Sequence, residues 1–290
     1  WVPRYKYKIW TTTTSSKGSE QTIEVVFEDK TTPKSTGTTV GSYRTHPAFT
    51  FGDAELNGIW VGKFETTGDA TTPTVKPNLQ SLRSQKVSEQ FSTAQKFGTI
   101  AYGSSVQIDA HMMKNSEWGA VAYLSHAKYG VNREIYINNS SGFYSVRGGG
   151  NVGGSTAINT VYTDQTSTAK INTYGFYTWD GYLLNYDTNT KSSTHDISKV
   201  ASTTGNITGV YDMSGGAHEY VMGNYSSTKG SSGFSTMPAS KYYDVYSKSE
   251  INFCTIDTCG GHALFETAEW YGDHDSFVSS SRPWFTRGCS

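Results

Sequence analysis

The chain has 290 residues, of which 35% are hydrophobic and 17% charged, and its formal net charge is -1. A chain of this length buries about 70–75% of its unfolded surface, so it supports one large domain with a sizeable core. The low charge and the many Ser, Thr, Gly, Asn and Tyr residues favour a loop-rich extracellular domain over a helical cytosolic enzyme. Because no dense Lys/Arg patch is present, nucleic acid is not an expected partner.

The termini predict a domain that belongs to a longer chain. No run of 18 or more apolar residues occurs, so the sequence predicts neither a membrane-spanning helix nor a signal peptide. The opening WVPRYKYKIW alternates like a strand in progress, and the closing RPWFTRGCS stops on a turn-like glycine. We therefore expect a processed or excised domain of a longer protein.

The first third of the chain has the alternation of β-strands. Two strands are expected, RYKYKIW and TIEVVFED, separated by a Thr/Ser/Gly-rich turn at 11–19. A third strand, LNGIWVGKFETT, is expected at 56–67 from its period-2 apolar pattern. These boundaries divide the chain into N-terminal strands and a loop over 1–57, packed on the same domain as the main part, 58–290.

Two segments have helical spacing. In the first, apolar residues recur at steps of four and three over 87–97, with Ser88 as the expected N-cap and a glycine that ends the run. The second helix follows Asn115 or Ser116 as its cap and ends near residue 130.

Beyond residue 131 the sequence predicts no helix. EIYINN, INTYGFYTW and GVYDM are expected to be short strands or extended pieces between long Gly/Ser/Thr/Asn loops. No repeat with a period of 20–50 residues is visible, which argues against propellers and solenoids. The predicted fold class is α+β, with two helices, small antiparallel sheets and long irregular loops.

Catalytic and metal-binding patterns are sparse. No G-x-S-x-G elbow, P-loop, dinucleotide fingerprint or H-E-x-x-H zinc motif occurs. An acid/base pair of carboxylates needs a fixed separation, which sequence cannot supply, and each candidate is more often a solvated or structural group. The candidates are Glu219, Glu266, Glu269, Asp273 and Asp275. The histidines are scattered without metal-ligand spacing: His46, His111, His126, His195, His218, His262 and His274.

The segment ETAEWYGDHDSFVSSSRPWFTRG, 266–288, is the most informative stretch. Aromatic residues beside Asp, His and Arg in a loop are typical of a binding surface, because they combine rigid contact area with polar groups that orient a ligand. The other interpretation is that Trp270, Trp284 and Phe285 belong to the core and only the polar members face water. The expected ligand-binding residues are Trp270, Tyr271, Asp273, His274, Asp275, Arg282, Trp284 and Arg287.

Three cysteines are too few for a disulfide scaffold and lack zinc spacing. In an oxidising compartment the short loop CTIDTC would allow Cys254 and Cys259 to pair, which would leave Cys289 unpaired.

Four segments, in order, resemble the formylglycine-generating-enzyme/sulfatase-modifying-factor family. GIWVGKFETTG at 58–68 resembles its F.MGKYEVTN strand, and NSEWGAVAYLS at 115–125 its EAEWEYAAR helix. GVYDMSGGAHEYVMGN at 209–224 resembles its GLYDMSGNVWEWV.D turn, and PWFTRGCS at 283–290 its R.LRGGSW strand. The resemblance implies a C-type-lectin-like fold. The chain also resembles secreted or phage-associated proteins of gut Firmicutes and the variable proteins of diversity-generating retroelements, which display a ligand-binding face near the C-terminus.

The chain departs from the enzyme pattern at its cysteines. The family's oxidase activity needs a C-x4-C pair after the last strand motif, where a thiol binds copper and attacks the substrate. Here the pair with that spacing lies about 30 residues before that motif, and Cys289 replaces a glycine. We therefore expect no catalysis of this type.

The turn at 211–224 also departs from the family. Its Trp-Glu-Trp becomes His218-Glu219-Tyr220, so His218 is interpreted as a packing replacement for an indole. Gly216 replaces an Asn, and the two glycines predict positive φ or a close chain approach. The resemblance implies a calcium site made by Glu219 with the carbonyl groups of Gly215 and Ala217, since calcium prefers several oxygen ligands.

These observations favour a non-catalytic, extracellular ligand-binding domain, an adhesin or receptor-binding module whose ligand is a cell-surface protein or a glycan. Calcium is the one expected cofactor. Two alternatives remain open: an enzyme of the formylglycine-generating type, and a structural subunit of a surface filament or phage tail.

Overall fold

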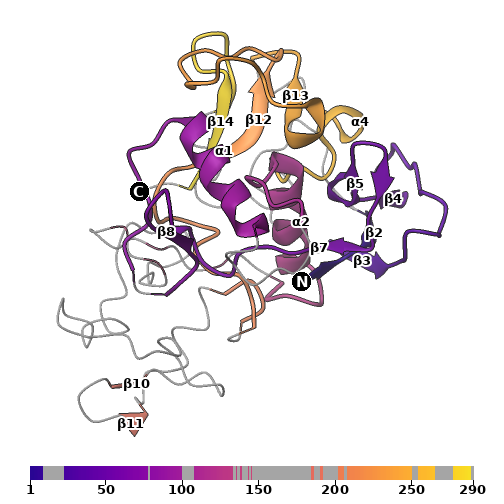
Figure 1. Ribbon diagram of the computed structural model, residues 1–290. Coiled ribbons are helices and arrows are strands. Elements are labelled where there is room, and N and C mark those ends of the chain that lie inside the picture. The colour runs from indigo at the N-terminus through magenta and orange to yellow at the C-terminus, as the bar shows by residue number, and fades with distance from the viewer. Residues whose placement is uncertain are drawn as a thin grey trace.

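The computed structural model confirms a mixed α and β architecture with few helices and small, mostly antiparallel sheets (Figure 1). It describes residues 1–8, 23–77, 79–99, 108–132, 202–205, 208–249, 254–264 and 277–288, the short strands at 184–185 and 190–191, and the single residues 135, 138, 143 and 145. No helix in these ranges is long and apolar enough to cross a membrane.

The N-terminal part forms a three-stranded antiparallel sheet in the order β3-β2-β4. β2 (Tyr5–Lys8) pairs with β3 (Glu24–Phe27) and with β4 (Arg44–Thr45). Tyr5 and Tyr7 are buried and alternate with partly buried lysines, as a strand with one face in the core requires. The Tyr5 hydroxyl donates to the Ala120 carbonyl at 2.7 Å, which joins this sheet to the second helix.

Short elements continue from this sheet. The turn η1 (Pro47–Phe49) packs on the second helix. β1 (Val2–Pro3) pairs with β7 (Gly58–Ile59), and β5 (Thr50–Phe51) pairs with β6 (Ala54–Glu55). β8 (Thr67–Gly68) pairs with β9 (Pro73–Thr74), and β10 (Leu184–Asn185) pairs with β11 (Thr190–Lys191). The predicted single strand over 56–67 is therefore wrong, because only its two ends pair.

Both predicted helices form, but each begins one residue or more before the predicted start. α1 (Val87–Gln95) continues into η2 (Lys96–Gly98), so the glycine stop is confirmed, whereas Ser88 lies inside the helix and not at its cap. The Glu89 carboxylate accepts from the Lys86 backbone N–H at 2.8 Å. The Ser88 N–H donates to the Ser232 carbonyl at 3.0 Å. A loop distant in sequence thus accepts a hydrogen bond from a backbone N–H group of the first helical turn.

α2 (Asn115–Ser125) shows the same kind of tertiary capping. Its Glu117 carboxylate accepts from the Lys114 N–H, and the Ser116 N–H donates to Asp244 at 2.7 Å. Neither Asn115 nor Ser116 is the N-cap. Ten of the eleven helical residues are buried, so α2 is a central helix and not an amphipathic surface one.

A second three-stranded sheet lies beside α2 in the order β13-β12-β14 (Figure 1). β12 (Glu219–Tyr225) is antiparallel to β14 (Trp284–Arg287) and parallel to β13 (Asp244–Tyr246). The turn η5 (Ser240–Tyr242) precedes β13, and the short α4 (Ile256–Cys259) follows it, so the expectation of no helix after 131 is wrong for these two pieces. GVYDM, expected to be a short strand or an extended piece, forms no strand.

The larger hydrophobic cluster gathers around α2 and the inner residues of both three-stranded sheets, with Tyr5, Trp118, Tyr123 and Phe285 among its members. A smaller cluster joins α1 to β12 and β14 through Phe91, Met222 and Trp284. The N-terminal strands therefore share one core with the rest of the chain.

Candidate functional site

The turn before β12 has the backbone conformation that its two glycines predict. Gly215 and Gly216 both have φ of +79°, a region that residues with a side chain rarely adopt. A Cβ placed on Gly216 would collide with the Glu65 carboxylate. The turn therefore requires glycine at this position, both for its φ and for the close approach of Glu65.

Three oxygen atoms converge beside this turn. The point where a Cβ would stand on Gly288 lies 2.6 Å from Glu219 Oε2, 2.9 Å from the Ala217 carbonyl oxygen and 3.0 Å from that of Gly215. Gly288 itself has a φ of +69°. The three residues that the sequence assigns to a calcium site thus direct oxygens toward Gly288, where a side chain would collide with all three.

Glu65 places a second carboxylate at the same turn. Its Oε1 accepts from the Ala217 N–H at 3.0 Å, its Oε2 accepts from the Ser81 hydroxyl, and the carboxyl group is hydrogen-bonded to Glu219. Burial raises the pKa of Glu65 above its ordinary value, although the bonds to Glu219, Ser81 and Ala217 oppose that rise. Two partly buried carboxylates held together are stable when they share a proton or a cation.

The types of donor match those that a calcium ion takes. Hard cations of this kind take carboxylate and backbone carbonyl oxygens, and Glu219, Gly215 and Ala217 supply both types beside Gly288, whereas the Glu65 carboxylate lies beside Gly216. Within the described ranges no group of three or more His, Cys, Asp or Glu side chains is placed to hold a metal. A calcium ion here would thus rest on carbonyl groups as well as side chains, and its role would be to hold the turn.

Arg287, expected at the binding surface, is completely buried. Its guanidinium donates to Asn115 Oδ1 at 2.7 and 2.9 Å, to the His262 carbonyl at 2.6 Å and to the Ala263 carbonyl at 3.1 Å. It also lies 3.9 Å above the Trp118 ring. This side chain holds β14 against the start of α2 and does not reach a ligand, so its expected role is corrected.

Trp284 is also an interior residue, with 4% of its surface exposed. Its indole N–H donates to the Lys229 carbonyl at 3.0 Å, and its ring packs against Phe234 and Tyr243. The alternative assignment of Trp284 and Phe285 to the core is therefore the correct one. Trp284 supports the 226–236 loop from beneath instead of contacting a ligand.

Arg282 is the one member of the expected binding set that the described ranges place on the surface. It is exposed in a tight turn, where the Ser279 N–H donates to the Arg282 carbonyl at 2.9 Å and the Arg282 N–H donates to Ser279 Oγ at 3.0 Å. Trp270, Tyr271, Asp273, His274 and Asp275 lie outside the described residues, as do the candidate carboxylates Glu266 and Glu269.

The cysteines and His218 complete the list of expected functional groups. Cys254 and Cys259 form a disulfide and are buried, whereas Cys289 lies outside the described residues. The interpretation of His218 as a packing residue is wrong, because its side chain is exposed.

Sequence reasoning missed two groups. Glu65 lies in a segment expected to be a plain strand, and its only signal is a place in the GKFETT motif. The second group surrounds Asp109, which accepts from Lys241 at 2.9 Å and from the Tyr242 hydroxyl at 3.1 Å. His111 lies between Asp109 and Glu117, at 3.3 and 3.1 Å. Lys241 and Tyr242 are more than 130 residues from Asp109 in sequence, so no motif could reveal that they meet.

A scan of the chain against profiles of known protein families found no match, and a search of curated proteins found no significant relative.

Proposed function

We propose that this chain is a non-catalytic, extracellular ligand-binding domain of C-type-lectin-like fold, carried on a longer surface-displayed or virion-associated protein. Its ligand is a cell-surface protein or glycan. The observation that carries the proposal is a pair of exposed loops, 226–236 and 279–282, held rigidly at the end of the β13-β12-β14 sheet. We call these residues the loop face.

Hydrogen bonds fix the backbone of the loop face, and most of its residues are exposed, although Ser232 is buried and Phe234 packs against Trp284. Asn224 accepts from the Thr228 N–H at 2.8 Å and donates to the Thr228 carbonyl at 2.9 Å. The Tyr225 N–H donates to the Pro283 carbonyl at 2.8 Å, which brings the two loops side by side. Rigid loops on a packed scaffold lose little conformational entropy on binding, which is the arrangement that recognition domains use.

The chemistry of the loop face favours an acidic ligand. The two loops contain Lys229 and Arg282, many serines and no Asp or Glu. Hydroxyl groups bind sugar or peptide polar groups, and the two cations attract a carboxylate or sulfate on the partner. The expected partner is therefore an acidic glycan or an acidic patch of a cell-surface protein.

The proposed domain has no catalytic activity and binds a calcium ion. The pairing of Cys254 with Cys259 supports a non-catalytic role, because oxidase chemistry of the resembled family uses free thiols. The oxygens around Gly288 support a calcium ion that fastens the turn before β12, and this turn leads directly into the strand that carries the loop face.

The test is a binding screen with the purified chain against arrayed neutral and acidic glycans and against whole cells, in wild-type form and with Arg282→Ala. A matched control is Lys30→Ala, which removes an exposed cation far along the chain from the loop face. We expect Arg282→Ala to weaken binding of acidic ligands about 10-fold and Lys30→Ala to leave it unchanged. Binding that ignores Arg282, or turnover of a Cys-containing peptide with copper by the folded chain, would refute the proposal.

A further inference from the structure

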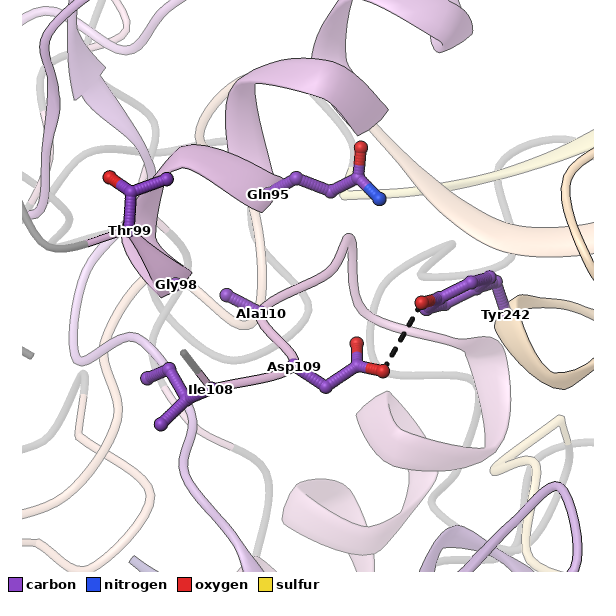
Figure 2. A pocket seen from close by; sticks show the side chains of 7 residues that line it. All are labelled: Gln95, Gly98, Thr99, Ile108, Asp109, Ala110 and Tyr242. Atoms are coloured by element: carbon purple, nitrogen blue, oxygen red, sulfur yellow. Dashed lines mark hydrogen bonds between the residues drawn. The ribbon is translucent and has the colours of Figure 1, made fainter. Parts of the chain in front are cut away.

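A polar pocket of about 310 Å³ lies between the end of α1, the segment 108–110 and η5 (Figure 2). Gln95, Thr99, Asp109 and Tyr242 are the polar residues on its wall. It shares no residue with the loop face. Its volume is at the lower end for small-molecule sites, which limits the occupant to a molecule of about one or two rings.

Gly98 allows the pocket to form. A Cβ on this residue would collide with the Ile108 carbonyl oxygen and lie 3.2 Å from Ala110 Cβ. The end of the α1 and η2 helical segment therefore packs directly against 108–110, which brings Asp109 to the pocket wall. The position of this carboxylate is thus determined by the packing of Gly98 against the backbone of 108–110.

Asp109 is held in one orientation and keeps room for a further donor. Its Oδ2 accepts from Lys241 Nζ at 2.9 Å and from the Tyr242 hydroxyl at 3.1 Å, and its Oδ1 lies 3.3 Å from His111 Nδ1. A carboxylate has about four lone-pair sites, and three neighbours occupy at most three of them. One acceptor site is therefore left for a ligand hydroxyl group.

The remaining polar groups supply both donors and acceptors. The Gln95 amide is exposed and offers an oxygen and an NH₂ group. The Thr99 hydroxyl donates to the Lys96 carbonyl at 2.7 Å, which leaves its oxygen as an acceptor. Groups that accept and donate at several points match vicinal hydroxyl groups, each of which is also donor and acceptor.

The charges around the pocket are matched within the protein. Lys241 pairs with Asp109, and His111 lies 3.1 Å from Glu117. Among the described residues that line the pocket, Asp109 is the charged one and is paired with Lys241, and no Lys or Arg is present on the wall. An uncharged ligand gains the hydrogen bonds here without disturbing an ion pair.

We infer that this pocket binds a neutral, polyhydroxylated ring, either a free monosaccharide or the terminal sugar of a neutral glycan. The expected affinity for a monosaccharide is on the order of 1 mM, because so small a ligand makes few contacts. This ligand class differs from the acidic ligand of the loop face, and the two sites do not depend on each other.

The test is a titration of the full chain with glucose, galactose, mannose and N-acetylglucosamine, followed by calorimetry or NMR chemical shifts. Glucuronate and glucosamine represent the acidic and basic classes, and methyl glycosides and neutral oligosaccharides distinguish a glycan terminus from a free sugar. Gln95→Ala removes an exposed side chain that lines the pocket. Gln90→Ala is the matched control, because it removes the same type of side chain from α1 at a position outside the pocket. Asp109→Asn tests the carboxylate.

We expect at least one neutral sugar to bind, with affinity reduced about 2- to 10-fold by Gln95→Ala, about 10- to 100-fold by Asp109→Asn, and unchanged by Gln90→Ala. Gln95→Ala alters an exposed side chain, so it keeps the test valid if Asp109→Asn disturbs folding. The inference is overturned if no neutral sugar binds the folded chain, if the acidic or basic sugar binds better, or if both pocket variants bind like wild type. Arg282→Ala should not affect this binding, so failure here and failure of the loop face are separate results.

Discussion

Arg282 and Arg287 lie on the same short stretch of chain, yet they belong to regions with opposite properties. Arg287 is in the interior behind β14, where every bond it makes holds two parts of the fold together. Arg282 is on the loop face, in a turn whose backbone bonds leave its side chain exposed. An aromatic- and Arg-rich stretch of sequence can thus contain both core residues and surface residues, and burial decides which of them are able to contact a ligand.

Substitution of these two arginines should change the free energy of unfolding by very different amounts. Arg287→Met should lower the free energy of unfolding by roughly 3–5 kcal/mol, because it leaves buried acceptors at His262, Ala263 and Asn115 without their donor. Arg282→Met should change it by less than about 0.5 kcal/mol. Equilibrium unfolding in urea measures both. Equal losses in the two variants would contradict the division between interior and surface.

Calcium should stabilise the fold if it binds the oxygens of Glu219, Gly215 and Ala217 beside Gly288. Calcium at about 100 times its Kd should raise the free energy of unfolding by about 2.7 kcal/mol. Glu219→Gln should abolish that rise, because it removes the carboxylate charge beside Gly288, and Glu65→Gln should reduce it, because it removes the carboxylate that is hydrogen-bonded to Glu219. Asp53→Asn, an exposed carboxylate in the β5–β6 turn, is the control that should keep it. A rise that survives Glu219→Gln would place calcium elsewhere.

Sequence patterns predicted the α+β class and both helices because apolar periodicity and a stopping glycine are local signals. The starts of the helices could not be predicted, because distant residues supply the hydrogen-bond acceptors. Ser232 and Asp244 accept from backbone N–H groups in the first turns of α1 and α2. The convergence of Gly215, Ala217 and Glu219 could be anticipated from one contiguous motif. Glu65 and the Asp109 pocket could not, because tertiary packing alone brings their partners together.

The buried histidine His126 should make the interior of the fold sensitive to acid. Burial lowers the pKa of His126 to about 3, so the folded state resists protonation that the unfolded state accepts below its ordinary pKa. Stability should therefore fall as the pH drops from about 6.5, by about 2 kcal/mol at pH 5 from this residue. His126→Gln should flatten that part of the pH profile measured by urea unfolding, although His46, whose pKa burial also lowers, should leave some slope.

An unchanged acid slope in His126→Gln would show that another group controls it. His111→Gln is the matched control, since it removes a histidine from the pocket side of the molecule and should leave the slope below pH 6.5 in place.

The smallest expected effect has the opposite sign and comes from His111 at the edge of the pocket. Burial alone would lower the pKa of His111, but the hydrogen bond to Glu117 and the charges of Glu117 and Asp109 outweigh it and raise the pKa above its ordinary value. The folded state then holds this proton more tightly than the unfolded state, so its contribution is complete below about pH 6.5 and is lost as the pH rises through the raised pKa. His111→Gln should remove this alkaline loss while His126→Gln retains it. NMR titration of the two imidazoles checks the assignment directly, and a His111 pKa below that of an unfolded peptide would contradict it.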